Sequence, residues 1–423
     1  MDGPGAESRV LSLTGEMTRT LLANGVEVLT ERIPGVRSVS VGVWVRQGSA
    51  HESPELMGAS HLLEHLVFKG TASRSAREIA LALESLGGSL DAYTSREHTS
   101  FQARVLDEHM PVALEVLADL VRNPLLRDSD LDLEREVVLE EIATVEDTPD
   151  DLVFDLHGAS FWDGHPYGNS ILGTRETVGG MPGHALRDLH SSRYTGGSIV
   201  VAAAGHLRHD DVVARVEDLF GLIPQGEPVH PLPALPSLPV GERWVERETS
   251  QAHLVFGSAI PGHSDPRRFP LLLLSSALGG GMSSRLFQRI REELALAYAV
   301  FTFQSFYSLA GISGVYVGTR PAMAGKAVEA VREELDRVAR EGIPEEELEQ
   351  TKDQVKGQIM LSLESTVARL YRLAGFALHR EPLTTLDELL AKVDAVTGED
   401  VARVAARHFA SEEHLLLRLG PGA

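Results

Sequence analysis

The sequence has no cysteine among its 423 residues, so disulfides, thiolate metal sites and cysteine nucleophiles are excluded. This absence fits a reducing compartment. No run of about 18 apolar residues occurs, and no membrane span is therefore expected. The first eight residues lack the basic and apolar segments of a signal peptide, and they are too acidic for a mitochondrial transit peptide. We accordingly expect a cytoplasmic protein.

Basic residues are also scarce. The chain has 39 Lys and Arg against 61 Asp and Glu, which gives a formal charge of −22. Because no basic helix and no Lys/Arg patch interleaved with aromatics occurs, nucleic acid is not an expected partner. An acidic surface can steer basic peptides toward it, although solvation is the commoner reason for such a surface. The sequence also lacks G-x-S-x-G, which disfavours a serine hydrolase.

The order of predicted strands and helices recurs in the two halves of the chain, which indicates a duplication. Six prolines between Pro224 and Pro239 mark a linker between the halves. We therefore predict the α+β fold class, with two homologous domains whose mixed or antiparallel sheets are covered by helices. The predicted boundaries are residues 1–223 for the first domain, 224–240 for the linker and 241–423 for the second domain.

The run His61-Leu62-Leu63-Glu64-His65 carries the first chemical signal. On a helix, His61 and His65 lie on one face, where both rings can bind a single metal ion. Glu64 shares this face without being needed as a ligand, and the spacing is that of the inverted zinc-peptidase motif H-x-x-E-H. Two helix histidines at a polar boundary are the alternative. The corresponding stretch of the second half, Ser284–Ile290, has no histidine pair, so we expect one metal site per chain.

A third ligand is needed, because catalytic zinc usually takes three from the protein. Residues 131–145 show a helical pattern that places Glu134 and Glu141 on the core-facing side and Glu136 and Glu140 toward solvent. The apolar members of the core-facing side are Leu131, Val137, Val138, Ile142 and Val145. A carboxylate in such a setting requires a pairing charge or a metal. An ion pair with Arg or Lys is the alternative, but coordination also completes the histidine pair.

With these motifs in place, the sequence resembles the pitrilysin/insulinase family of zinc peptidases, most closely the two-domain processing peptidases of bacteria and mitochondria. In that family a distant glutamate ligand follows the inverted motif, and a second glutamate stands seven residues before it, as Glu134 does before Glu141. The resemblance implies His61, His65 and Glu141 as zinc ligands, Glu64 as catalytic base and Glu134 as their support. It implies a zinc-dependent endopeptidase of the bacterial cytoplasm whose two domains form a half-shell.

The same resemblance implies a functional pair in the second half. The family has an arginine followed seven residues later by a tyrosine, which help to bind the substrate backbone and to stabilise the tetrahedral intermediate, and Arg291 and Tyr298 have this spacing. In relatives assembled from two half-shells, this pair approaches zinc from the opposite half. Because this chain carries both the zinc motif and the pair, a homodimer with active sites completed in trans is implied. A heterodimer is the alternative.

The stretch from Leu90 to Thr99 resembles the family's edge strand, which pairs with an extended peptide substrate. The implied substrate-binding residues are Asp91, Ala92, Tyr93 and Thr94. The family commonly has asparagine at the position of Asp91, so a direct amide contact is not expected there. An ordinary sheet edge is the alternative for this stretch.

Two other functions compete with peptide hydrolysis. One is a non-enzymatic scaffold or partner subunit, like the core subunits of respiratory complex III, which share this fold. Those subunits typically have damaged motifs, whereas His61, Glu64, His65 and Glu141 are all present here. The other is a metal-dependent hydrolase that acts on a different substrate.

Overall fold

The computed structural model describes residues 7–12, 15–227 and 231–422. Residues 1–6, on which much of the signal-peptide expectation depends, and residues 228–230 of the predicted linker lie outside these ranges. The chain divides into two compact units, each made of three segments. The first unit consists of Met1–Ile142, Asn169–Leu232 and Leu361–Asp387, and the second consists of Ala143–Gly168, Pro233–Met360 and Glu388–Ala423.

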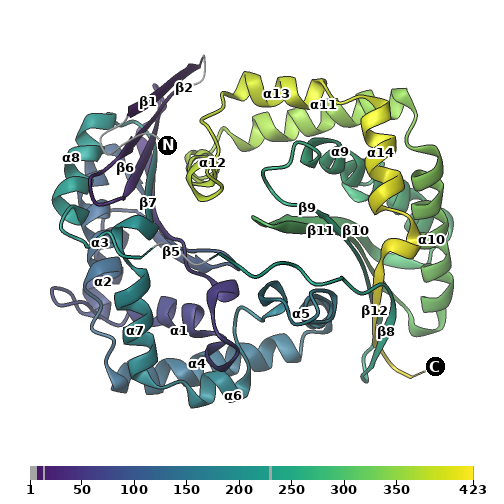
Figure 1. The fold of residues 1–423 in the computed structure, drawn as a ribbon, viewed down its shortest axis with the longest axis horizontal. Coiled ribbons are helices and arrows are strands. Elements are labelled where there is room, and N and C mark those ends of the chain that lie inside the picture. Colours follow the sequence, from purple (N-terminus) through teal and green to yellow (C-terminus); the bar gives the residue numbers. More distant parts are fainter. Residues whose placement is uncertain (1–6, 13–14, 228–230, 423) are drawn as a thin grey trace. The chain divides into compact units, whose positions relative to one another are not determined.

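The first unit is organised around a seven-stranded sheet with the order β1-β2-β3-β7-β4-β6-β5 (Figure 1). Neighbouring strands are antiparallel, except that β3 and β7 are parallel. The strands are β1 (Glu7–Ser12), β2 (Gly15–Leu21), β3 (Glu27–Arg32), β4 (Ser38–Val45), β5 (Ser89–Thr94), β6 (Thr99–Leu106) and β7 (Ile199–Gly205). Among the described residues, β5 pairs with β6 alone and therefore has one free edge.

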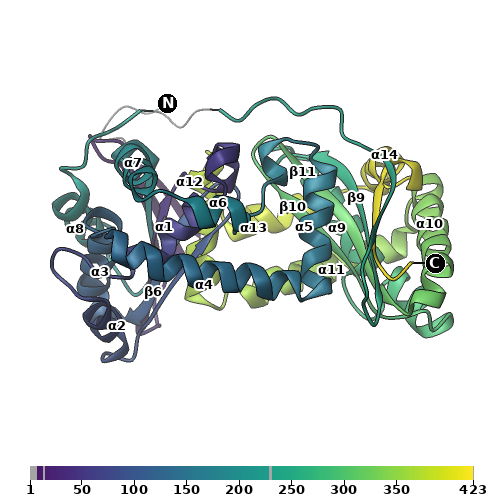
Figure 2. The same ribbon diagram turned by 90° about the horizontal axis from the view of Figure 1, so that it is seen from below.

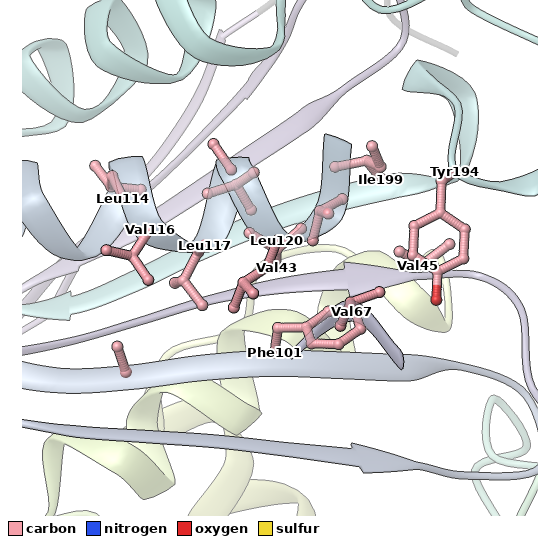
Figure 3. Close-up of a cluster of buried hydrophobic side chains, with 14 of the residues drawn as sticks. Val43, Val45, Val67, Phe101, Leu114, Val116, Leu117, Leu120, Tyr194 and Ile199 are labelled. Carbon is pink, nitrogen blue, oxygen red and sulfur yellow. The ribbon is translucent and has the colours of Figure 1, made fainter. Parts of the chain in front are cut away.

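Period-two alternation in β4 explains how this sheet acquires two buried faces. Val43 and Val45 join the larger core, where α3 packs against the sheet, and Figure 3 shows Leu117 and Leu120 of that helix above them. Trp44 joins a second apolar cluster on the opposite face. The helices of the first unit are α1 (Ala59–Val67), α2 (Ala76–Glu84), α3 (Met110–Arg122), most of α4 (Asp128–Glu146), α6 (Arg175–Gly180), α7 (Gly183–Arg193), α8 (His209–Phe220) and α12 (Thr366–Leu378).

The second unit repeats this plan in a five-stranded sheet with the order β10-β11-β9-β12-β8. Its strands are β8 (Gly241–Glu246), β9 (Ala252–Pro261), β10 (Ala297–Phe306), β11 (Ala310–Thr319) and β12 (Leu415–Gly420). Only β8 and β12 are parallel. Its helices are α5 (Pro149–Phe161), α9 (Arg268–Gly279), α10 (Ala324–Glu341), most of α11 (Glu345–Ser362), most of α13 (Leu386–Asp394) and α14 (Gly398–His408), with a π-helix at Phe287–Glu293.

The strand order β3-β7-β4-β6-β5 matches β8-β12-β9-β11-β10 strand for strand, including the single parallel pair. This agreement confirms the predicted two-domain α+β class. One predicted correspondence needs correction. The motif helix α1 is the first α-helix after β4, so its counterpart is α9, the first α-helix after β9, and not Ser284–Ile290. No histidine occurs in Arg268–Gly279 either.

The units differ from the predicted division at residues 224–240 because each half of the chain gives one helix to the other unit. Helix α12 comes from the C-terminal half and covers the Trp44 face of the first sheet. Helix α5 comes from the N-terminal half and packs on β9 and β12 of the second sheet, opposite the face covered by α10 and α14 (Figure 2). The physical reason is that both faces of each sheet are apolar and require a cover.

Polar contacts tie α12 into the first unit. Thr366 Oγ1 and Ser40 Oγ of β4 are hydrogen-bonded at 2.8 Å, and Arg369 forms an ion pair with Glu31 of β3. Glu31 and Arg369 are both buried.

Among the described residues, no helix combines the length and the apolar composition that spanning a membrane requires.

Candidate metal centre

The helix that carries both histidines begins in a fixed geometry. Gly58, which precedes α1, has a φ of +89°, and a Cβ there would lie 2.6 Å from the carbonyl oxygen of Leu172. Only glycine fits such a position without strain. The carboxylate of Glu52 accepts hydrogen bonds from the backbone N–H of Gly58 at 2.8 Å and of Ser60 at 2.6 Å. Glu52 therefore satisfies two N–H groups that the first turn of a helix leaves without partners.

The α1 helix presents His61 and His65 to one residue of α4. The Nε2 atoms of the two rings lie 3.7 Å and 3.8 Å from the same oxygen, Oε2 of Glu141. The ligand atoms of all three residues lie within 4.8 Å of one another. The structure thus brings together the three residues predicted as ligands.

A second carboxylate of α4 orients one of the rings. Oε2 of Glu134 lies 3.1 Å from Nδ1 of His65, and its Oε1 lies 2.6 Å from Nζ of Lys69. Glu134 is buried, so the ammonium of Lys69 offsets the cost of keeping its charge there. A proton held on Nδ1 of His65 by Glu134 leaves the lone pair on Nε2, which faces Glu141.

Glu64 lies beside the cluster without joining it. Its Oε2 accepts a hydrogen bond of 2.6 Å from Oγ1 of Thr94, at the end of β5. Burial raises the pKa of Glu64, and the charge of Glu141 adds to this rise, whereas the Thr94 hydrogen bond and His65 oppose it. A carboxyl group with a raised pKa, held in one orientation, is suited to accept and return a proton.

The donor set fits a zinc ion. Two imidazole nitrogens and one carboxylate oxygen are typical of catalytic zinc, and ligands about 2 Å from a tetrahedral ion stand roughly 3.4 Å apart. The separations of 3.7 Å and 3.8 Å are close to this value. Burial lowers the pKa of His61 to about 4, and His65 adds to this effect, so the ring is neutral near pH 7 and free to coordinate. In the described structure, Nδ1 of His61 has no hydrogen-bond partner.

Comparisons with known proteins agree with this geometry. Residues 27–175 match the family model described as insulinase, peptidase family M16, and residues 184–355 match the model described as the peptidase M16 inactive domain. An uncharacterized zinc protease of Streptomyces coelicolor is 38% identical over 96% of this chain and 90% of its own length. The uncharacterized zinc protease YmxG of Bacillus subtilis is 40% identical over 94% of this chain and 97% of its own length.

This chain belongs to the insulinase family of peptidases. The resemblance found in the sequence is thereby confirmed. Solved structures of low identity support the fold. A peptidase M16 inactive domain from Pseudomonas fluorescens has a TM-score of 0.91 at 20% identity, covering 96% of this chain and 98% of its own. A protease from Helicobacter pylori has a TM-score of 0.88 at 21% identity, covering 96% and 100%.

The insulinase-family pair predicted in the second half lies in the second unit. The guanidinium of Arg291 packs over the ring of Tyr298, 4.4 Å from its centroid, and over the ring of Phe287 at 4.7 Å. Its NH1 also donates a hydrogen bond of 3.2 Å to the carbonyl oxygen of Tyr298. The residue Tyr298 is 78% exposed, so its hydroxyl is accessible to solvent. Arg291 and Tyr298 are therefore in direct contact. The helix that carries Arg291 is a π-helix.

The predicted substrate strand of the insulinase family corresponds to β5. Asp91 is exposed, Ala92 and Tyr93 are half-buried, and Thr94 is buried with its hydroxyl on Glu64. Thr94 was predicted only as a substrate-binding residue, and its contact with the predicted base is therefore new. Its position at the end of β5 links the free sheet edge directly to the candidate metal centre.

The helical pattern of α4 was partly wrong. Val137 was placed on the core side, but it is 49% exposed. The side chain of Glu141 is 43% exposed, whereas that of Glu134 is 6% exposed. The sequence reasoning also missed Lys69 and Glu52. Lys69 follows the end of α1 at Val67 and Glu52 precedes the start of this helix, so no periodic pattern indicates either residue.

Proposed function

We propose that this chain is a zinc-dependent endopeptidase that hydrolyses peptides or unfolded polypeptide segments. The observation that supports this most is the convergence of the ligand atoms of His61, His65 and Glu141 within 4.8 Å, with Glu64 beside them. Membership of the insulinase family and the names of its relatives as zinc proteases agree with it.

Each of these residues is proposed to have a separate role in hydrolysis. His61, His65 and Glu141 would hold a zinc ion, which would supply Lewis-acid polarisation of a water molecule and of the scissile carbonyl. Glu64 accepts the proton of the attacking water and returns it to the leaving amine. Thr94 fixes one oxygen of this carboxylate and leaves the other available for the proton.

The substrate is proposed to bind along the free edge of β5. Backbone pairing with Asp91, Ala92 and Tyr93 adds a strand to the sheet and makes little demand on sequence, which suits broad specificity. Because β5 ends at Thr94, and Thr94 contacts Glu64, a peptide on this edge runs toward the base.

Arg291 and Tyr298 are proposed to bind the substrate backbone and to stabilise the oxyanion through a cation and a phenol donor. They are proposed to act on the site of a second copy of the chain in a homodimer. The match of residues 184–355 to the family's inactive domain agrees with a second half that supports chemistry without holding metal.

The test combines metal analysis with hydrolysis of a quenched fluorescent peptide library. We expect about one zinc per chain, cleavage of internal peptide bonds, loss of cleavage with a chelator and recovery on addition of zinc. An inactive scaffold, whether or not it contains zinc, would cleave no peptide in any of these conditions. A hydrolase of another substrate class would bind zinc and leave all peptides intact, and either result would reject the endopeptidase.

A further inference from the structure

An open hollow of about 660 Å³ lies beside the end of α1, the start of α2 and the start of α4, within the first unit. Its wall is formed by the loop from Lys69 to Ser75, by the first two residues of α2, and by Leu125, Arg127 and Asp130. Sites for small ligands commonly have volumes of about 300–1,000 Å³. The hollow is therefore large enough for a small ligand.

The wall carries an excess of positive charge in a chain that is acidic overall. Lys69, Arg74, Arg77 and Arg127 line the hollow, against one acidic residue, Asp130. The whole chain has 39 Lys and Arg against 61 Asp and Glu, so the local ratio is the reverse of the composition. A concave surface lined by charges of one sign raises the local concentration of ions of the opposite sign. The hollow therefore favours an anion.

Two of the cations are held from behind by carboxylates that do not line the hollow. Nζ of Lys69 lies 2.6 Å from Oε1 of Glu134, and NH1 of Arg74 lies 2.7 Å from Oδ2 of Asp119. Glu134 and Asp119 are buried, whereas the side chains of Lys69 and Arg74 are 38% and 26% exposed. The carboxylates offset part of the positive charge, but they also fix both cations in the wall.

The other two arginines are more exposed. Nε of Arg127 donates to Asp130 at 2.7 Å and its NH2 donates to the carbonyl oxygen of Lys69 at 3.1 Å, and neither bond uses NH1. Arg77 lies in the first turn of α2, and its exposed side chain forms no ion pair or hydrogen bond among the described residues. A cation in the first turn of a helix is unfavourable, so helix stability does not explain Arg77. An anion in the hollow would offset this cost.

The loop that carries this charge is fixed by its own contacts. Gly70 has a φ of +135°, a conformation that residues with a side chain rarely adopt. The hydroxyls of Thr71 and Ser73 each donate a hydrogen bond of 2.6 Å to Oδ2 of Asp119. The backbone N–H of Leu125 donates to the carbonyl oxygen of Gly70 at 3.0 Å. Because the cations are already in place, binding requires little ordering of the chain.

A phosphate group matches this wall better than a carboxylate does. A phosphomonoester has a charge of about −1.5 to −2 near pH 7 and three acceptor oxygens. Guanidinium groups bind such oxygens through paired N–H donors. Leu125, which also lines the hollow, is 42% exposed. Its side chain offers an apolar contact to an organic group attached to the phosphate.

We propose that this hollow binds a phosphate group, free or carried by a small phosphomonoester. Arg77 and Arg127 are its principal contacts, and Lys69 and Arg74 add positive charge from the wall. The site is separate from peptide hydrolysis and does not depend on the proposed function.

Isothermal titration calorimetry of the full zinc-loaded chain tests the site, with inorganic phosphate and phenyl phosphate as probes at constant ionic strength. We expect saturable binding with a dissociation constant of about 1 mM or below, which weakens as sodium chloride is raised. Arg77→Gln and Arg127→Gln should each weaken binding by about fivefold to tenfold, and the double variant by about thirtyfold or more. Arg32→Gln, an exposed arginine of β3 outside the hollow, is the matched control and should bind as the wild type does.

The design separates this site from the candidate metal centre. Lys69 is left unchanged because it also contacts Glu134. Phosphate bound to zinc would not respond to Arg77→Gln, so only binding that this variant weakens belongs to the hollow. Arg77→Gln alters an exposed side chain without partners among the described residues, so it should fold as the wild type does.

The two probes distinguish the sources of the phosphate group. Tighter binding of phenyl phosphate than of inorganic phosphate, with the difference lost in Leu125→Ser, would assign a phosphomonoester, and equal binding of both probes would assign free phosphate. Absence of saturable binding, or equal binding by the wild type and the double variant Arg77→Gln/Arg127→Gln, would overturn the site. Neither of these results depends on whether the chain cleaves peptides.

Discussion

Oε2 of Glu134 lies 3.1 Å from Nδ1 of His65, so a residue that is not a ligand determines which nitrogen of a ligand is free to bind metal. The other oxygen of Glu134 lies 2.6 Å from Nζ of Lys69. Lys69, Glu134 and His65 are therefore linked in series, from a residue outside the cluster to one of its predicted ligands. The cluster should therefore respond to changes at residues that never touch the ion.

The first prediction concerns Lys69. Lys69→Met removes the cation that stabilises the buried charge of Glu134, so the hold of Glu134 on His65 should weaken. We expect zinc affinity to fall by about tenfold, measured by competition with a chromophoric chelator. Lys69→Arg should keep most of the affinity. Lys326→Met, an exposed lysine of α10, serves as the matched control. Equal zinc affinity in Lys69→Met and the wild type would rule out this role.

The second prediction concerns the ion pair between Glu31 and Arg369, which joins α12 to the first sheet. Arg369→Met leaves the carboxylate of Glu31 buried without its cation, and we expect a loss of about 3–5 kcal/mol in the free energy of unfolding. Urea titration monitored by fluorescence and circular dichroism measures it. The double variant Glu31→Gln/Arg369→Met should lose less than Arg369→Met alone. An equal or greater loss in the double variant would show that the pair is not coupled.

The third prediction concerns pH. Burial raises the pKa of Glu52 from 4.5 to about 7, against the effect of its hydrogen bonds from Ser60 and Gly58. Between pH 4.5 and about pH 7, the folded chain binds more protons than the unfolded chain. The free energy of unfolding therefore falls as pH rises through this range. Relative to Glu52→Gln, the wild type should therefore lose up to about 3 kcal/mol of unfolding free energy from pH 4.5 to pH 8. A difference that stays flat or increases with pH would contradict the raised pKa.

The fourth prediction concerns the second half of the chain. Glu64→Gln and Tyr298→Phe chains are each expected to be nearly inactive alone. A mixed dimer with sites completed in trans would contain one site with both Glu64 and Tyr298 and one site with neither. Purified mixed dimers, isolated with two affinity tags, should recover close to half of the wild-type peptidase activity. No recovery would show that the pair acts within its own chain or not at all.

Local sequence patterns predicted much of this molecule. Helical periodicity controls which side chains share a face, and the structure brings His61 and His65 together with Glu141. Their role as zinc ligands remains a prediction. The duplication is confirmed by the strand order. Helical periodicity was less reliable for α4, where Val137 lies on the predicted core side and is exposed. A helical wheel gives the direction of each side chain around the helix axis. It does not show how far along the helix the packing neighbours extend.

Contacts between distant segments could not be predicted in this way. The exchange of α5 and α12 between the units leaves no periodic signal, because an apolar helix face does not specify which sheet it covers. The contact of Thr94 with Glu64 and the pairing of Lys69 with Glu134 depend on where β5 and α4 lie around α1. The predicted roles of Arg291, Tyr298 and the β5 edge remain predictions.

The most direct test of the account is the turnover of Glu64→Gln at full zinc occupancy. Glu64 is not a ligand, so the variant should contain about one zinc per chain, as the wild type does, while its kcat for peptide hydrolysis falls by about 10²–10⁴. Measuring zinc content and kcat on the same sample separates loss of metal from loss of the base. Turnover near the wild-type rate in a zinc-replete Glu64→Gln sample would contradict the assignment of Glu64 and the mechanism built on it.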